Sequence, residues 1–320
     1  MNNILQGAMK NILQGIGIIF TLIASFLGLM YALKGDVIIS TIVSLVIIVI
    51  EYFLIEKFIQ SKSEITKNKF STLSIILWSI YVLLSIPTSV FLLHALNVEI
   101  NAKKEIQKSA NNKLADLDTM IQLYESAVDR NLTTLSIQLS NKLTRYSQKR
   151  STELENELLA APFKMSISEL QSVSETNVAI VSRNLLNAKA TKLMAIVDTI
   201  KVSNKNFIAR YGGVFDNWAR LQVNYALYEL DYILKKNNSI LSTHFSQNCP
   251  YPTGTFFYKQ SSEETNISRP IILFLKYKPY YLLIALALFH LLILFPYIIE
   301  PVAGVYIKKD KKPGGGGTVL

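Results

Sequence analysis

Four apolar runs in the chain are each long enough to cross a lipid bilayer as a helix. A spanning helix needs about 20 mostly apolar residues, because the hydrocarbon layer is about 30 Å thick and each residue rises about 1.5 Å. Since lipid offers no hydrogen bonds to the backbone, such runs are expected to be helical throughout. The predicted spans cover residues 13–33, 37–57, 72–96 and 279–298.

The hydrophobicity of the chain is concentrated in blocks near its two ends. Half of the 320 residues are hydrophobic, and the mean hydropathy is +0.28. This pattern predicts an all-α membrane protein with four transmembrane helices and a long helical, coiled-coil-like extramembrane domain between spans three and four. The predicted regions are a membrane region with three spans at 1–96, an elongated helical domain at 97–270, the fourth transmembrane helix at 271–300 and a basic, glycine-rich tail at 301–320.

Lysine and arginine in short loops mark the cytoplasmic side of a membrane protein. The short loop between spans one and two carries only Lys34, although Arg269, Lys276 and Lys278 lie on the same predicted side and are contrary evidence. The charge pattern predicts a protein of the bacterial cytoplasmic membrane, with both termini cytoplasmic and residues 97–270 extracytoplasmic. The supporting residues are Lys10, Lys57, Lys62, Lys67, Lys69, Lys308, Lys309, Lys311 and Lys312.

Small residues inside the first span indicate close helix packing. Gly17, Thr21 and Ser25 recur every four residues, with Gly28 beside them. Small side chains let a second helix approach closely, which is how helices associate where lipid removes the hydrophobic drive. In the third span, Pro87 removes a backbone hydrogen bond and predicts a helix kink.

Two ionisable residues lie at depth within the predicted spans. Glu51 is about two turns inside the end of span two, and His290 is near the middle of span four. Ionisable groups at such depth are costly and usually face a partner or a water-filled cavity. Two interpretations of this candidate polar pair are open. One is a proton or ion relay in which His290 titrates; the other is a neutral histidine hydrogen-bonded to a neighbouring span, with Glu51 reaching the interface.

The extramembrane domain is predicted to consist of three long helices. Residues 88–161 contain no glycine or proline, so span three is expected to continue as one helix, with residues 111–112 as the expected interruption. The third helix is expected to fray at residues 235–239. The other expected boundaries are Pro162, a capping box at Ser166 and Glu169, Gly212–Gly213 and Asp216.

Apolar residues of the first long helix form a narrow stripe that repeats every eleven residues. Such a repeat keeps the stripe on one face of a nearly straight helix, which is typical of a coiled coil or elongated bundle. We interpret the stripe as a helix–helix interface. Its members are Ile121, Tyr124, Val128, Leu132, Leu135, Leu139, Leu143 and Tyr146.

The sequence contains few signs of specific chemistry. It has no GxSxG, HExxH, P-loop or dinucleotide-binding motif, no metal-ligand spacing around its three histidines and no arginine-rich stripe for nucleic acid. We therefore expect a non-enzymatic protein without cofactors, metal or nucleic acid. The last three residues, Thr318, Val319 and Leu320, have the form of a ligand for a PDZ-type groove. The glycine run before them is equally typical of an artificial addition.

Three functions remain open at this stage. The first is a structural or assembly subunit of a multi-protein envelope complex, such as a secretion machine, which uses its helical domain to form homo-oligomers or to bind other envelope proteins. The second is an ion- or proton-conducting membrane component that uses Glu51 and His290. The third is a membrane sensor that lacks an output domain of its own.

Overall fold

The computed structural model describes residues 2–63, 72–249, 256, 258–259 and 267–299, and these residues contain helices but no strand. They form two compact units, which we describe separately. Unit 1 comprises residues 1–106, 219–225 and 265–320, and unit 2 comprises residues 107–218 and 226–264. Unit 1 holds the apolar helices, and unit 2 holds most of the long amphipathic ones.

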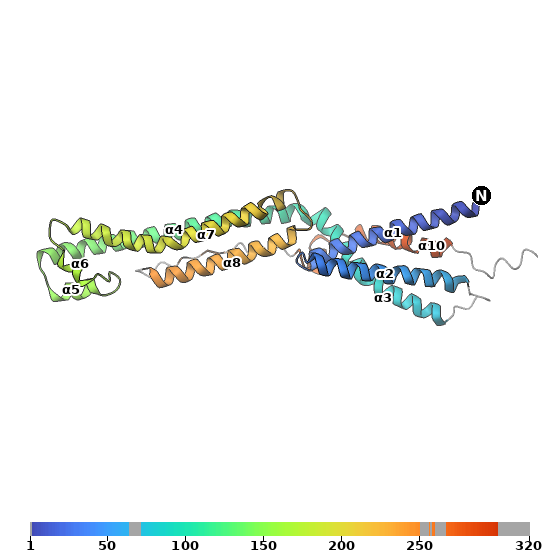
Figure 1. Ribbon diagram of the computed structural model, residues 1–320, viewed down its shortest axis with the longest axis horizontal. Coiled ribbons are helices and arrows are strands. Elements are labelled where there is room, and N and C mark those ends of the chain that lie inside the picture. The colour runs from blue at the N-terminus through green and yellow to red at the C-terminus, as the bar shows by residue number, and fades with distance from the viewer. Residues whose placement is uncertain (1, 64–71, 250–255, 257, 260–266, 300–320) are drawn as a thin grey trace, which may run out of the picture. The chain divides into compact units, whose positions relative to one another are not determined.

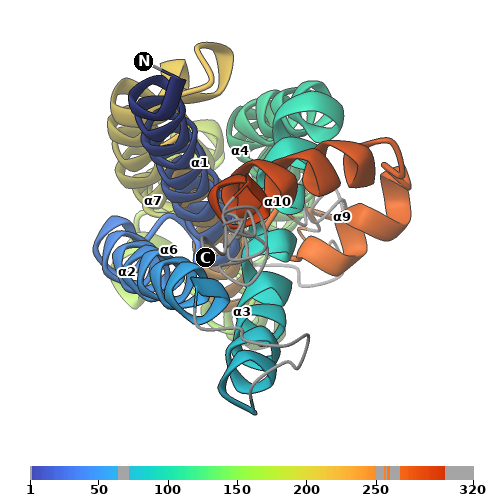
Figure 2. The same ribbon diagram turned by 90° about the vertical axis from the view of Figure 1, so that its right-hand side faces the viewer.

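Four helices among the described residues are long and apolar enough to span a membrane, which confirms the four-span prediction and makes the chain an integral membrane protein. In unit 1, α1 packs against the other three, and Figure 2 shows α2 and α9 on opposite sides of α3 and α10. The helices of this unit are α1 (Asn2–Ala32), α2 (Val37–Ser63), α3 (Thr72–Asn97), α9 (Pro270–Tyr277) and α10 (Leu282–Ile299).

Glycine sets the distance between the spanning helices. A Cβ atom on Gly28 would lie 2.2 Å from the carbonyl oxygen of Phe91, so α1 and α3 meet backbone to backbone there. At Gly17 an added Cβ would lie 3.4 Å from Ile293 of α10, an ordinary contact. The two glycines of the stripe in α1 therefore face two different helices, which the sequence pattern alone did not separate.

The helix of α3 does not stop where the apolar run ends. It continues through a π-helical turn, η1 (Val98–Ala102), into α4 (Lys103–Gln148). The predicted interruption at residues 111–112 is wrong, because both asparagines are helical and the Asn111 amide donates to the Asp216 carboxylate at 3.1 Å. The irregular turn instead occurs at η1, and π-helical turns of this kind are frequent at functional sites.

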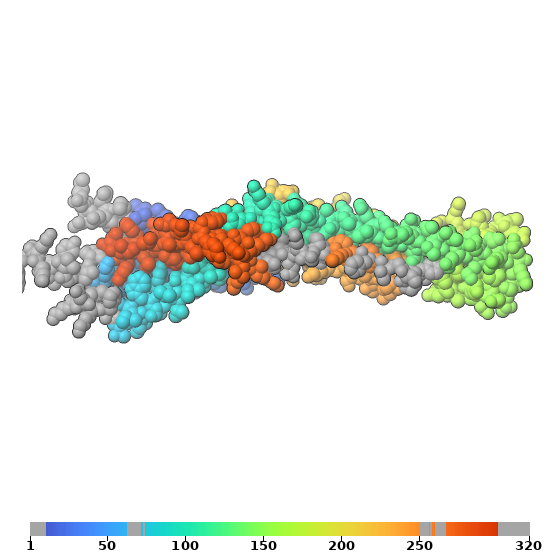
Figure 3. All heavy atoms as spheres, turned by 180° about the vertical axis from the view of Figure 1, so that it is seen from behind, coloured from blue at the N-terminus to red at the C-terminus, as the bar shows by residue number. Residues whose placement is uncertain are grey.

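Unit 2 is a bundle in which α4, α7 (Val178–Asp216) and α8 (Val223–Asn248) run side by side, with α5 (Thr152–Leu159) and α6 (Ile167–Gln171) at one end of it (Figure 1). Figure 3 shows the side chains of α4 packed continuously along one face of this unit.

Several predicted boundaries in unit 2 need correction. The first long helix ends at Gln148 rather than Pro162, because the Ser151 hydroxyl accepts from Leu154 and starts α5. The capping box at Ser166 is confirmed. The predicted stop at residues 212–213 is wrong, since both glycines lie inside α7, and residues 235–239 are helical rather than frayed.

The apolar stripe of α4 forms the core of unit 2. Leu135, Leu139 and Leu143 are completely buried, and they pack with Leu158 of α5 and Leu170 of α6 in one cluster. Leu132 is partly buried against the same cluster, and the rest of the stripe is buried: Ile121, Tyr124, Val128 and Tyr146. The stripe therefore joins helices of the same chain, and a contact with another molecule would use a different surface.

Candidate functional site

His290 of α10 is hydrogen-bonded to α3 through both ring nitrogens. Nδ1 lies 3.1 Å from the Tyr81 hydroxyl, and Nε2 lies 2.8 Å from the Ser89 hydroxyl. The Tyr81 ring also meets the imidazole edge to face at 6.2 Å. A neutral imidazole has one donor and one acceptor nitrogen, and a hydroxyl can serve either, so both nitrogens are satisfied.

Glu51 of α2 belongs to the same polar network but does not contact His290 directly among the described residues. Its carboxyl lies near Thr88 and close enough to Tyr81 to interact electrostatically. The Thr88 hydroxyl also lies 3.0 Å from the carbonyl oxygens of Leu84 and Ser85, near Pro87. The predicted pair is thus connected through α3, by residues on either side of the proline.

The intramembrane network contains Glu51, Tyr81, Thr88, Ser89 and His290. It joins α2, α3 and α10 in a region where an unpaired polar group has no water to bond, so each contact holds two helices together. Proton transfer from Ser89 to Tyr81 through the two ring nitrogens would require, in addition, a donor that reprotonates Ser89 and an acceptor for the proton that Tyr81 releases. Tyr81 was missed in the sequence because a lone tyrosine in an apolar run is usually interfacial.

At one end of unit 1, Lys62 closes the last turn of α10. Its ammonium donates to the carbonyl oxygens of Tyr297 and Ile298 at 2.6 and 3.3 Å and lies 4.6 Å from the Tyr297 ring. A cation at a helix C-terminus satisfies free carbonyls and complements the helix dipole. Phe58 and Trp78 pack around the same tyrosine, which ties α2 and α3 to the end of α10.

The opposite end of unit 1, which we call the η1 end, is built around Glu99 in the π-helical turn. The Glu99 carboxylate accepts from Tyr31 of α1 and, at 2.9 Å, from Nε of Arg220. This hydrogen bond raises the pKa of the Arg220 guanidinium above its usual value. Asn224 donates to the carbonyl oxygens of Met30 and Tyr31 at 3.1 and 2.6 Å and so closes the last turn of α1.

Further contacts at the η1 end connect α9 and the turn that follows it to η1 and the start of α4. Glu105 accepts from Lys276 and Tyr277, and these hydrogen bonds lower the pKa of its carboxyl group. The Tyr281 hydroxyl donates to Asn101 at 2.8 Å. Lys276, one of the basic residues that opposed the predicted orientation, is therefore paired with a carboxylate. The sequence contained no signal for these pairs, because their members are far apart in the chain.

Unit 2 buries polar groups of its own. Lys113, almost fully buried, pairs with Asp231 at 2.8 Å, and Asn237 donates to Asn204 at 2.8 Å. The Tyr124 hydroxyl donates to the Leu193 carbonyl at 3.0 Å and lies 2.9 Å from Nδ1 of His244, and burial raises the pKa of Tyr124 to about 12.

Burial raises the pKa of the Cys249 thiol to about 11, so this cysteine is protonated near neutrality and is a poor nucleophile.

The remaining predicted site residues have structural surroundings or lie outside the description. Thr21 donates to the Gly17 carbonyl at 2.9 Å, and Ser25 is buried without a hydrogen-bond partner in the described part of the chain. Pro87 lies inside α3. Within the described residues no group of three or more potential ligands could hold a metal ion. The C-terminal Thr318, Val319 and Leu320 lie outside the described residues.

Together, the spanning helices and their polar network define the chain as an all-helical integral membrane protein with a long helical second unit. Comparison with protein-family models, with curated proteins and with solved structures gave no match.

Proposed function

We propose that this protein is a non-enzymatic assembly subunit of a membrane complex, which holds a long helical domain beside the membrane for binding to other proteins or to further copies of itself. One observation carries the proposal: the turn between α7 and α8, residues 219–225, is part of unit 1. Arg220 and Asn224 of this turn bind Glu99 and the end of α1. The turn that joins α7 to α8 is thus hydrogen-bonded within the membrane unit.

The helices of unit 2 supply the surface for this role. A helix the length of α7, with 39 residues, extends for about 58 Å. Because its apolar stripe is used internally, unit 2 leaves single exposed apolar or aromatic residues for partners, among them Ile137, Ile208 and Tyr232. Aromatic side chains contribute strongly to protein interfaces.

The proposal predicts a discrete assembly in mild detergent. Light scattering coupled to gel filtration is expected to give either an oligomer of the 36.1 kDa chain or a complex with a stoichiometric membrane protein. Photo-crosslinking amino acids at positions 137, 208 and 232, with buried Leu139 as the matched control, identify the contact surface in membranes. A monodisperse monomer that forms no crosslink at any of the three positions contradicts the proposal.

The proposed orientation places unit 2 outside the cytoplasm and both termini inside. Cys249 is a poor reporter because it is buried, so the test uses Cys249→Ser with a single new cysteine. Exposed Ser140→Cys is expected to react with a membrane-impermeant maleimide in intact cells, and Thr66→Cys only after permeabilisation. The reverse labelling pattern would show that the topology is inverted and that the protein is a cytoplasmic scaffold.

A second candidate function is proton or ion transfer, which the Tyr81–His290–Ser89 network favours. Under this alternative, His290→Phe in liposomes abolishes proton flux measured with an internal pH dye. Under the assembly proposal, the same substitution lowers the thermal midpoint, because Tyr81 and Ser89 lose their partner, and no flux is observed for either protein. Glu51→Gln provides an independent second position for the flux measurement.

A further inference from the structure

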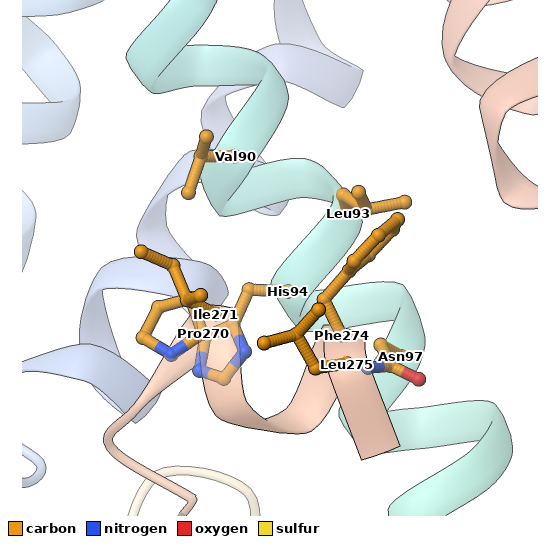
Figure 4. Close-up of a pocket in the computed structure, with 8 residues that line it drawn as sticks. All are labelled: Val90, Leu93, His94, Asn97, Pro270, Ile271, Phe274 and Leu275. Carbon is orange, nitrogen blue, oxygen red and sulfur yellow. The ribbon is translucent and has the colours of Figure 1, made fainter. Parts of the chain in front are cut away.

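A pocket of about 260 Å³ lies between α3 and α9 in unit 1. α9 packs against the last turns of α3, and Figure 4 shows the imidazole of His94 extending from α3 toward α9, beside the Pro270 ring. Six of the eight lining residues are apolar. The lining consists of Val90, Leu93, His94, Asn97, Pro270, Ile271, Phe274 and Leu275.

The imidazole of His94 is the buried polar group in this pocket whose hydrogen bonding needs an explanation. The residue is only 3% exposed, yet neither ring nitrogen makes a hydrogen bond of ordinary geometry with the part of the chain that the structure describes. The backbone of Ile267 lies near the imidazole, and the Tyr31 ring meets it edge to face at 6.2 Å. Buried polar groups in native proteins nearly always have a partner. The pocket therefore has room for an apolar group beside an imidazole whose ring nitrogens lack a hydrogen bond of ordinary geometry within the described residues.

The mouth of the pocket opens among exposed apolar side chains. Ile271 and Leu275 line the pocket and are 73% and 63% exposed, which suits an occupant that arrives from the bilayer rather than from water. Tyr281, bonded to Asn101, has an amphipathic side chain suited to the headgroup level. His94 precedes Asn101 by seven residues, or about 10 Å along the helix. The imidazole thus lies near the boundary between headgroups and hydrocarbon.

We propose that this pocket binds one acyl chain of a membrane glycerolipid, whose ester carbonyl accepts a hydrogen bond from His94. The volume is below the range of about 300–1,000 Å³ that drug-sized ligands need, so it suits part of a single chain. An ester carbonyl lies where the chain leaves the headgroup region, and a neutral imidazole has one N–H to donate to it. Arg269 and Lys278, at the two ends of α9, suit the lipid phosphate.

The test uses the full-length protein in liposomes that contain a trace of phosphatidylethanolamine with a diazirine on one acyl chain. After irradiation, adducts mapped by mass spectrometry are expected to concentrate on residues 90–97 and 270–275. His94→Leu is expected to lower labelling there about two- to ten-fold, which is the effect of losing one hydrogen bond. His94→Gln keeps an N–H donor and retains more labelling than His94→Leu.

Two further variants keep the test decisive. Val90→Phe fills the pocket without altering His94 and is expected to reduce labelling as well, while Ile284→Leu, on the exposed face of α10, leaves it unchanged. Equal labelling along all spanning helices overturns the proposal, as does equal labelling of His94→Leu and the parent protein. A diazirine-bearing free fatty acid that labels the pocket when the phosphatidylethanolamine probe does not also overturns it, because the occupant is then not a glycerolipid.

Discussion

Units 1 and 2 differ in the side chains that they expose and in the residues that pack between their helices. In unit 1 the exposed side chains of the spanning helices are mostly apolar, and the contacts between helices combine two apolar clusters with close approach at glycine and a polar network. In unit 2 the exposed side chains are mostly polar, and a stripe of leucines fills the interior. The comparison shows that the surroundings of each unit change which residues add specificity to an apolar interior: glycine and intramembrane polar contacts in unit 1, and a regular stripe of leucines in unit 2.

The largest expected effect is at the closest helix contact of unit 1. Gly28→Ala forces α1 away from the Phe91 carbonyl oxygen and is expected to destabilise the protein by about 3 kcal/mol, at the upper end for over-packing. Thermal unfolding in detergent, followed by gel filtration, measures the change.

Two matched glycines serve as controls for this substitution. An added Cβ on Gly15 meets nothing within 4 Å, and one on Gly17 makes an ordinary contact at 3.4 Å. Because alanine favours the helix, Gly15→Ala is expected to be neutral or stabilising by up to about 1 kcal/mol, with Gly17→Ala close to neutral. If Gly28→Ala and Gly15→Ala have equal thermal midpoints, α1 does not approach α3 as described.

In unit 2, a substitution that shortens a large buried side chain is expected to be similarly destabilising. Leu139→Ala leaves a cavity in the leucine core and is expected to destabilise unit 2 by about 2–5 kcal/mol. Ile137→Ala, two residues away and 61% exposed, is expected to change stability by less than about 0.5 kcal/mol. Hydrogen exchange along α4 in the full-length protein distinguishes the Leu139→Ala variant from the Ile137→Ala variant. Similar exchange in both variants would mean that the stripe is not the core.

The sequence predicted the features that depend on long runs of one residue type. Four apolar runs are enough to place four spanning helices, and Ser166 with Glu169 is enough to start a helix. The end of α4 at Gln148 was missed, although Ser151 followed by Glu153 is a helix-start signal, because the absence of proline and glycine was given more weight.

The rest of the fold and site depends on contacts between distant residues. Asn111 was expected to interrupt the helix, but its side-chain amide donates a hydrogen bond to Asp216 and the helix continues. The π-helical turn η1 has no local signature, and Glu99 within it contacts α1 and the α7–α8 turn. In the same way, Glu51 and His290 were identified as costly residues, but their connection through α3 required Tyr81 and Ser89 to be placed in space.

The Lys113–Asp231 ion pair extends the comparison of the two units. Unit 2 buries this lysine, whereas burying a lysine in lipid costs much free energy. Lys113 is buried, while the Asp231 side chain is 31% exposed and keeps access to water. Asp231→Asn leaves the ammonium without its anion and is expected to cost about 2 kcal/mol, less than for a fully buried pair. The double variant Lys113→Met with Asp231→Leu is expected to recover most of this loss in a denaturant titration. No recovery would show that these positions matter for something other than charge pairing.

The smallest effect is expected at the η1 end, where the membrane unit meets water and its ion pairs should behave as surface pairs do. Lys276 and Tyr277 lower the pKa of Glu105, so the carboxylate contributes stability above its ordinary pKa of 4.5, and this contribution is lost as the pH falls through the lowered value. Because the side chain is 46% exposed, the contribution is expected to be below about 1 kcal/mol. The thermal midpoints of the parent protein and Glu105→Gln should therefore differ slightly at about pH 7 and converge as the pH falls below the lowered pKa of Glu105. A difference that widens on acidification would mean that the neutral carboxyl is the stabilising form, and Glu105 would then behave as a buried group of the spanning unit rather than as part of its water-exposed end.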